Sequence, residues 1–164
     1  MTLGQVGIAL GVLGVVMAYA ALAVRWTASG RRWYASLRRP SWQPPDAVFG
    51  VVWPLSFLTV AVAGVGVAAE GPPRDALVWT LLLAASVAMA LGWAHEFYVA
   101  QRLSRAAVLL AGASVLTWGL VAVTADLVPW AGWLITPYAV WLSLATTLAF
   151  GYWRLADRGE PTPA

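Results

Sequence analysis

The chain has 164 residues, of which 61% are hydrophobic and 10% are charged, and its formal net charge is +3. Because soluble domains carry about 25% charged residues, this composition indicates a membrane protein with one small domain. Cysteine is absent and histidine occurs once, which excludes disulfides, thiolate chemistry and clustered histidine ligands, so we expect no metal site. The positive charge adjoins apolar segments, where membrane topology accounts for it without nucleic acid as a partner.

Five segments are apolar and long enough to cross a bilayer, which takes about 20 residues per helix. They are residues 3–24, 47–69, 76–98, 106–125 and 130–153. No positively charged residue precedes the first segment, so we expect a retained helix rather than a cleaved signal. The short breaks between the later segments predict antiparallel neighbours. The expected fold is an all-α integral membrane protein: a five-helix bundle over residues 1–155, with a disordered tail at 156–164.

The distribution of arginine predicts the orientation of this bundle. With five spans, the first connection, the third connection and the C-terminal end share one side of the membrane. That side carries Arg25, Arg31, Arg32, Arg38, Arg39, Arg102, Arg105, Arg154 and Arg158, and the other side carries Arg74. The positive-inside rule then predicts a multi-pass protein of the bacterial plasma membrane, with its N-terminus outside and its C-terminus in the cytoplasm.

The tryptophans fall into two groups. Those near the ends of the segments fit the aromatic belts of membrane interfaces. Four lie nearer mid-span: Trp53, Trp93, Trp118 and Trp141. Because a buried indole N–H needs a hydrogen-bond partner, a position lining a cavity is favoured over contact with lipid for Trp53 and Trp141. Trp93 and Trp118 fit either position.

Two stretches resemble one known family. Residues 33–55, WYASLRRPSWQPPDAVFGVVWPL, resemble the signature of the TspO/translocator protein family, the tryptophan-rich sensory proteins. That signature reads roughly W-Y-x-x-L-x-K-P-x-W-x-P-P, then x-x-x-F-G-P-V-W. Residues 136–155 resemble the last helix of the family through Pro137, Tyr138, Trp141, Ala145 and Leu148. The resemblance covers essentially the whole chain.

The resemblance implies a five-helix bundle, often a homodimer, that binds porphyrins, sterol-like molecules or isoprenoid lipids between its helices for sensing, transport or ligand turnover. The long first connection, 25–46, would close the pocket as a lid, and its arginines would suit porphyrin carboxylates. No cofactor is required, and a tetrapyrrole enters only as a ligand. The expected ligand-binding residues are Trp33, Trp42, Phe49, Trp53, Gly92, Trp93, His95, Trp141 and Ala145. The alternative is that this aromatic stripe is packed core.

The third segment departs from the family pattern, L-N-x-x-W-x-P-x-F-F. In LGWAHEFYVAQR, Gly92 replaces the asparagine and His95 replaces the tryptophan, so the ligand specificity of the family should not be copied. Glu96 is the only acidic residue clearly inside a segment, and ionisable groups at such depth usually face a cavity or a partner. Ala84, Ala88, Gly92 and Glu96 share one helix face, which fits either a close helix seam or space for a ligand.

Three roles stay open for Glu96. It can pair with Arg102 or Arg105 and anchor the helix end, or it can contact a ligand. Held protonated by burial, it can also act with His95 as the catalytic acid of a small cyclase or isomerase on a prenyl or terpenoid substrate, in a Trp-lined pocket. This enzyme is the alternative to ligand binding, and a purely structural role comes third.

Two weaker patterns concern lipid contact and assembly. Leu148, Tyr152 and Arg154 fit a proposed sterol-recognition pattern, although tyrosine and arginine at a helix end are ordinary interface anchors. Gly4, Gly7, Gly11 and Gly14 make the first segment smooth, which favours tight packing and a face for a second copy of the chain.

Overall fold

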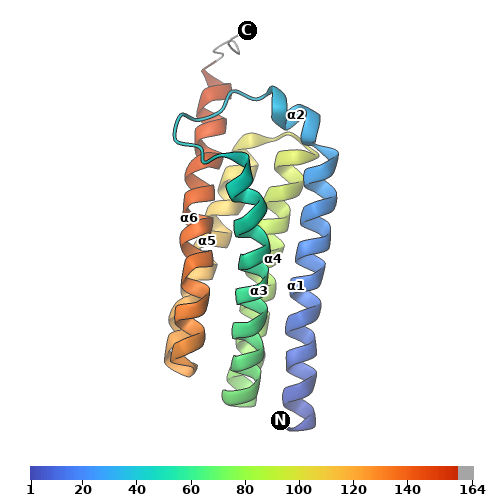
Figure 1. The fold of residues 1–164 in the computed structure, drawn as a ribbon, viewed down its shortest axis with the longest axis vertical. Coiled ribbons are helices and arrows are strands. Elements are labelled where there is room, and N and C mark those ends of the chain that lie inside the picture. Colours follow the sequence, from blue (N-terminus) through green and yellow to red (C-terminus); the bar gives the residue numbers. More distant parts are fainter. Residues whose placement is uncertain (159–164) are drawn as a thin grey trace.

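The computed structural model describes residues 1–158, and within them the chain forms five long helices and one short helix (Figure 1). The long helices are α1 (Leu3–Ser29), α3 (Asp46–Glu70), α4 (Pro73–Tyr98), α5 (Leu103–Leu127) and α6 (Pro129–Asp157), and the short one is α2 (Arg31–Ser36). Each long helix is apolar and long enough to cross a membrane, so the prediction of an all-α bundle of five membrane helices is confirmed. Most of the expected tail, residues 159–164, lies outside the described residues.

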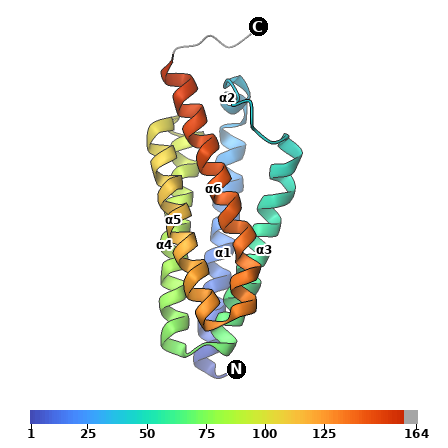
Figure 2. The same cartoon turned by 90° about the vertical axis from the view of Figure 1, so that its left-hand side faces the viewer.

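The five long helices form a ring in the order α1, α3, α6, α5 and α4, which is closed by packing of α4 on α1 (Figures 1 and 2). Contacts are most extensive between α5 and α6 and between α4 and α5, whereas α3 and α4 meet across the bundle at few points. The α4–α5–α6 side of the ring is therefore tightly packed, and the side formed by α1 and α3 is looser.

Several helix ends follow directly from the sequence. Thr2 and Gln5 form a capping box at the start of α1, with the Gln5 N–H donating to Thr2 Oγ1 (3.3 Å) and the Thr2 N–H donating to Gln5 Oε1 (2.7 Å). Pro73 and Pro129 begin α4 and α6, at a position where the missing N–H would have no helical partner. These starts allow the tight turns that join α3 to α4 and α5 to α6.

The core combines large aromatic rings with small residues. Trp79 of α4 is fully buried, and its indole N–H donates to Thr124 Oγ1 of α5 over 2.6 Å. A Cβ at Gly64 of α3 would come within 2.8 Å of the Trp79 ring, so the glycine permits this close approach. Large apolar side chains such as Met17 and Leu81 are exposed on the outside of the bundle, where lipid would cover them.

The arginines separate between the two ends of the bundle. The first connection, the α4–α5 connection and the end of α6 lie together at the end opposite the N-terminus (Figures 1 and 2). The nine arginines expected on a common side therefore share this end, and Arg74 lies at the other. The α1 glycines face outward, because a Cβ at Gly7, Gly11 or Gly14 would meet nothing within 4 Å.

Candidate functional site

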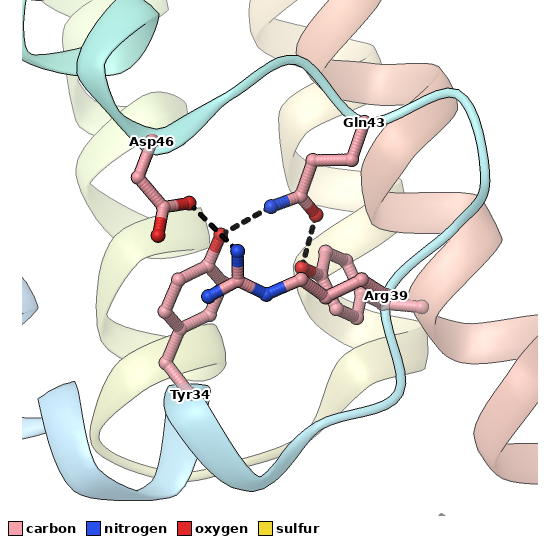
Figure 3. Close-up of polar contacts among 5 residues, drawn as sticks. Tyr34, Arg39, Gln43 and Asp46 are labelled. Atoms are coloured by element: carbon pink, nitrogen blue, oxygen red, sulfur yellow. Dashed lines mark hydrogen bonds and ion pairs between the residues drawn. The ribbon is translucent and has the colours of Figure 1, made fainter. Parts of the chain in front are cut away.

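The first connection crosses the arginine-rich end of the bundle and is fastened there by three polar side chains. Gln43 Nε2 donates to the Tyr34 hydroxyl (3.0 Å), and the Tyr152 hydroxyl donates to Gln43 Oε1. Tyr34 lies on α2, Gln43 on the segment that returns to α3, and Tyr152 on α6, so one amide joins three parts of the fold (Figure 3). We call these three residues the latch, and residues 30–45 the lid.

An ion pair braces the base of the lid. Arg39 Nη1 donates to Asp46 Oδ1 over 3.0 Å, and the Arg39 guanidinium carbon lies 5.6 Å from the centroid of the Tyr34 ring (Figure 3). The hydrogen bond to Asp46 raises the pKa of the Arg39 guanidinium. Both side chains are exposed, so the pair orients the lid more than it stabilises it.

The lid docks on α6 at a glycine. A Cβ at Gly151 would lie 2.9 Å from Pro40 Cγ and 2.9 Å from Trp42 Cζ2, so both rings occupy the slot left by the missing side chain. Trp42 is 54% exposed and lines none of the spaces beneath the lid. The Trp42 ring therefore packs on α6, outside these spaces, and its expected contact with a ligand stays a prediction.

Beneath the lid, between α3, α4 and α6, lies a narrow space of about 40 Å³. It is lined by Tyr34, Gln43, Phe49, Trp53, Trp93, Phe97, Tyr98, Ala145, Leu148, Ala149 and Tyr152. Sites for small organic molecules occupy about 300–1,000 Å³, so this space alone holds little more than water or one substituent.

Two larger spaces adjoin the narrow one on the looser side of the ring. The first, of about 290 Å³, is lined by α1, α3 and α4, and the second, of about 570 Å³, by α1, the lid, the start of α3 and the end of α4. Phe49, Trp53 and Tyr98 line all three spaces, which we therefore treat as one composite cavity. Its walls are mostly apolar, but Arg31, Arg39 and Asp46 border the largest part.

Trp53 is the centre of an aromatic cluster around this cavity. The Trp93 ring stacks on it at 6.1 Å with a 20° interplanar angle, and Trp141 meets it edge-on at 6.3 Å. The indole N–H groups of Trp93 and Trp141 are buried and have no hydrogen-bond partner among residues 1–158. A buried donor without a partner costs about 1–3 kcal/mol. An acceptor on a ligand would relieve that cost at Trp93, whose ring lines the cavity, but not at Trp141, which does not line it.

The structure brings most of the expected aromatic residues together. Phe49, Trp53, Trp93 and Ala145 line the composite cavity. Trp141 lies in a second layer, with its ring 5.2 Å from the Phe49 ring and 7% of its surface exposed. Trp33 packs edge-on against Phe97 at 5.3 Å, so it supports the cavity wall without lining it.

Three other expected residues, Gly92, His95 and Glu96, do not line the cavity. The lining residues of α4 are Trp93, Ala94, Phe97 and Tyr98. Since successive residues turn about 100° around a helix, the centre of that face lies roughly 130° from His95 and from Glu96, and roughly 170° from Gly92. A Cβ at Gly92 would instead meet Leu109 of α5 at 3.2 Å, so Gly92 packs against α5, whereas Ala88 of the same stripe is exposed.

Glu96 lies close to basic side chains rather than to the aromatic cluster. Its carboxylate oxygens are 3.8 Å from Arg102 Nη1 and 3.8 Å from His95 Nδ1, and His95 packs against Trp26 of α1 at 5.4 Å. A catalytic acid must reach its substrate within hydrogen-bond distance, about 3 Å. The cyclase or isomerase hypothesis placed Glu96 in the Trp-lined pocket, and it is corrected because the helix phase turns this side chain away.

The latch and part of the cavity wall are not among the site residues predicted from the sequence. On α6, Ala145, Leu148, Ala149 and Tyr152 line one face at three- and four-residue spacing. Continuing the face that begins at Ala145 would therefore have identified Tyr152. Gln43 carried no such signal, because only the folded path of the lid determines which residues it meets.

A family model described as TspO/MBR family matches residues 6–154, which include the lid and all the cavity walls. The chain belongs to the TspO/MBR family. Protein CrtK of Rhodobacter capsulatus is 31% identical to it over 130 residues, covering 76% of this chain and 79% of the relative. Translocator protein of Sus scrofa is 33% identical over 124 residues, which cover 72% of this chain and 71% of the relative. Tryptophan-rich sensory protein of Cereibacter sphaeroides is 32% identical over 123 residues, with 73% of each covered.

Membership of the TspO/MBR family, together with five helices able to span a membrane, makes this chain an integral, multi-pass membrane protein. Its described residues, 1–158, contain no group of three or more side chains suited to hold a metal ion. The site offered by this TspO/MBR member is therefore an aromatic cavity with an arginine-lined mouth under a latched lid.

Proposed function

We propose that this TspO/MBR protein binds a lipophilic ligand with acidic groups, of the tetrapyrrole class, in the composite cavity. The observation that carries the proposal is that Phe49, Trp53 and Tyr98 line three adjoining spaces. The outer two, of about 290 and 570 Å³, reach the size of small-molecule sites. The ligand therefore lies between α1 and α3 beneath the lid, and the space of about 40 Å³ beside α6 receives at most one substituent.

The walls suit a flat, apolar ring system. The stacked pair of Trp53 and Trp93 presents aromatic surface to the cavity, and Phe49 and Tyr98 add further rings to the same walls. Aromatic rings in contact gain about 0.5–1.5 kcal/mol beyond the burial of apolar area. The unpartnered indole N–H of Trp93 adds a donor suited to a ring nitrogen or an oxygen of the ligand.

The mouth of the cavity suits acidic substituents. Arg39 is engaged by Asp46, whereas Arg31 makes no ion pair within residues 1–158. A guanidinium group binds a carboxylate through paired, charge-assisted hydrogen bonds. A carboxylated tetrapyrrole satisfies both parts of the site, with its ring against Trp53 and a carboxylate at Arg31.

A neutral sterol-like or isoprenoid lipid is the second candidate, and the space of about 290 Å³ favours it. That space is lined by mostly apolar residues of α1, α3 and α4, among them the exposed Val24. Such a ligand would make no use of Arg31. The sterol-recognition pattern gives it no added support, because Leu148 and Tyr152 line the narrow space instead.

The proposed setting is a bacterial plasma membrane with the lid in the cytoplasm and the N-terminus outside. The arginines gathered at the lid end support this orientation. The outward glycines of α1 support a homodimer through that helix. Sensing, transport and ligand turnover would each begin with binding under the lid.

A titration of the detergent-purified protein with protoporphyrin in the dark, followed through quenching of tryptophan emission, tests the proposal. We expect saturable quenching, and an affinity about tenfold or more lower in Trp53→Ala, because a buried aromatic wall is lost. The matched variant Trp133→Ala removes a tryptophan that is 79% exposed and should keep the wild-type affinity. Quenching that does not saturate, or equal weakening by both variants, would contradict the proposal.

The acidic groups can be tested separately. Protoporphyrin dimethyl ester has the same ring but no carboxylates, so Arg31→Gln should bind it as the wild type does. The free acid should bind Arg31→Gln several-fold more weakly. Equal losses for both ligands would exclude Arg31 as the carboxylate partner.

A further inference from the structure

A second open space lies at the lid end of the bundle, between α4 and α5 and away from the composite cavity. It has a volume of about 470 Å³ and is lined by Glu96, Ser104, Arg105, Val108 and Leu109. None of these residues lines the composite cavity. α4 and α5 lie side by side in both views of the bundle (Figures 1 and 2). We call this space the α4–α5 groove.

The acidic wall of the groove is under-satisfied. The Glu96 side chain is 17% exposed, and its Oε2 atom is buried without a hydrogen-bond partner among residues 1–158. Its nearest cations, Arg102 and His95, are each 3.8 Å away, which is beyond hydrogen-bond distance. A partly buried carboxylate without hydrogen bonds is costly, and a primary ammonium group supplies three donors at once.

The basic wall of the groove comes from the first turn of α5. Ser104 and Arg105 are exposed, and neither makes a side-chain hydrogen bond or ion pair with another described residue. No side chain caps the start of α5 at Arg102, so the backbone N–H groups of this turn also lack a capping acceptor. A phosphate suits this combination of guanidinium, hydroxyl and helix start.

The floor of the groove is apolar and lies further from the lid end of the bundle. Val108 is 60% exposed and Leu109 lies beside it, about one helical turn beyond Ser104. That turn places the two side chains roughly 6 Å further from the lid end of the helix. Charged groups at the interface with an apolar strip below them match the order of groups in a phospholipid.

We propose that the α4–α5 groove binds a phospholipid whose headgroup carries a primary ammonium, such as phosphatidylethanolamine. The ammonium group donates hydrogen bonds to Glu96, the phosphate accepts them from Arg105 and Ser104, and an acyl chain lies against Val108 and Leu109. The presence of both charges on the groove walls selects this headgroup. A quaternary choline ammonium has no N–H to donate to Glu96, and phosphatidylglycerol has no cation for it.

Native mass spectrometry of the full-length protein in detergent, with equal amounts of added lipids, tests this site. We expect phosphatidylethanolamine to be retained about tenfold more than phosphatidylcholine, because one hydrogen bond to a charged group changes the affinity by about this factor. Stepwise N-methylation of the headgroup should lower retention stepwise. Equal retention of the two lipids by the wild type would overturn the proposal without the need for any variant.

Two variants assign the roles of the walls. Glu96→Gln should abolish the preference for phosphatidylethanolamine, whereas Glu70→Gln, at the opposite end of the bundle, should keep it. Arg105→Gln should weaken retention of every phospholipid several-fold, and Arg154→Gln, an exposed arginine at the same end, should not. A preference that survives in a Glu96→Gln protein with wild-type helicity would show that the carboxylate does not read the headgroup.

Discussion

Removing the Gln43 amide should release the lid. In Gln43→Ala, the bond from Gln43 to the Tyr34 hydroxyl (3.0 Å) and the bond from the Tyr152 hydroxyl are both lost. A hydrogen bond of this kind contributes about 0.5–1.5 kcal/mol, so closure of the lid should weaken by about 1–3 kcal/mol. That difference corresponds to a rise of about 5- to 150-fold in the population of the open lid.

Hydrogen–deuterium exchange of the lid segment, residues 30–45, measures this opening without a ligand. Exchange in Gln43→Ala should accelerate by the same factor, while the exchange of α5 should not change. Ser41→Ala is the matched control, because this exposed side chain lies in the same lid and is not part of the latch. Unchanged exchange in Gln43→Ala, or equal acceleration in Ser41→Ala, would refute the conclusion that the latch holds the lid closed.

Three further predictions concern packing and the limits of the site. Gly151→Ala should destabilise the protein by about 1–3 kcal/mol in thermal unfolding, because its Cβ would meet Pro40 and Trp42 at 2.9 Å. Gly119→Ala, with nothing within 4 Å, should be neutral or stabilising, and an equal loss in both variants would contradict the packing argument. Trp79→Phe should lower stability by about 1–2 kcal/mol, since its bond to Thr124 is lost, and an unchanged denaturation midpoint would refute this. Trp118→Ala should leave protoporphyrin affinity unchanged, because the Trp118 indole donates to Ser143 (3.0 Å) and lines no part of the composite cavity, and a large loss would contradict that placement.

The membrane bundle could be predicted from the sequence because hydropathy over about 20 residues is a strong signal. Phe49 and Trp53, which the sequence names as ligand-binding residues, both line the composite cavity, since the lid motif leads directly into this part of α3. That they bind a ligand stays a prediction. The connections between the helices could also be predicted, because glycine and proline act on the backbone locally.

The direction of individual side chains was harder to predict. Gly92, His95 and Glu96 belong to the same helix turns as Trp93, yet they point elsewhere. The rotation of α4 could not be predicted, because a helix that is apolar on nearly every side has no continuous polar face to indicate it. The packing of Trp42 could not be predicted for another reason: the slot that accepts its ring is created by Gly151, far away in the sequence. Contacts of this kind depend on packing, which single-sequence patterns do not contain.

The central claim, that a tetrapyrrole occupies the composite cavity between α1 and α3, is tested most directly by an experimental structure of the complex with protoporphyrin, prepared in the dark. We expect the ring beneath the lid, in contact with Phe49, Trp53 and Tyr98, with a carboxylate at Arg31. A ring bound on the outer surface of α5 and α6, with the composite cavity unchanged, would contradict it.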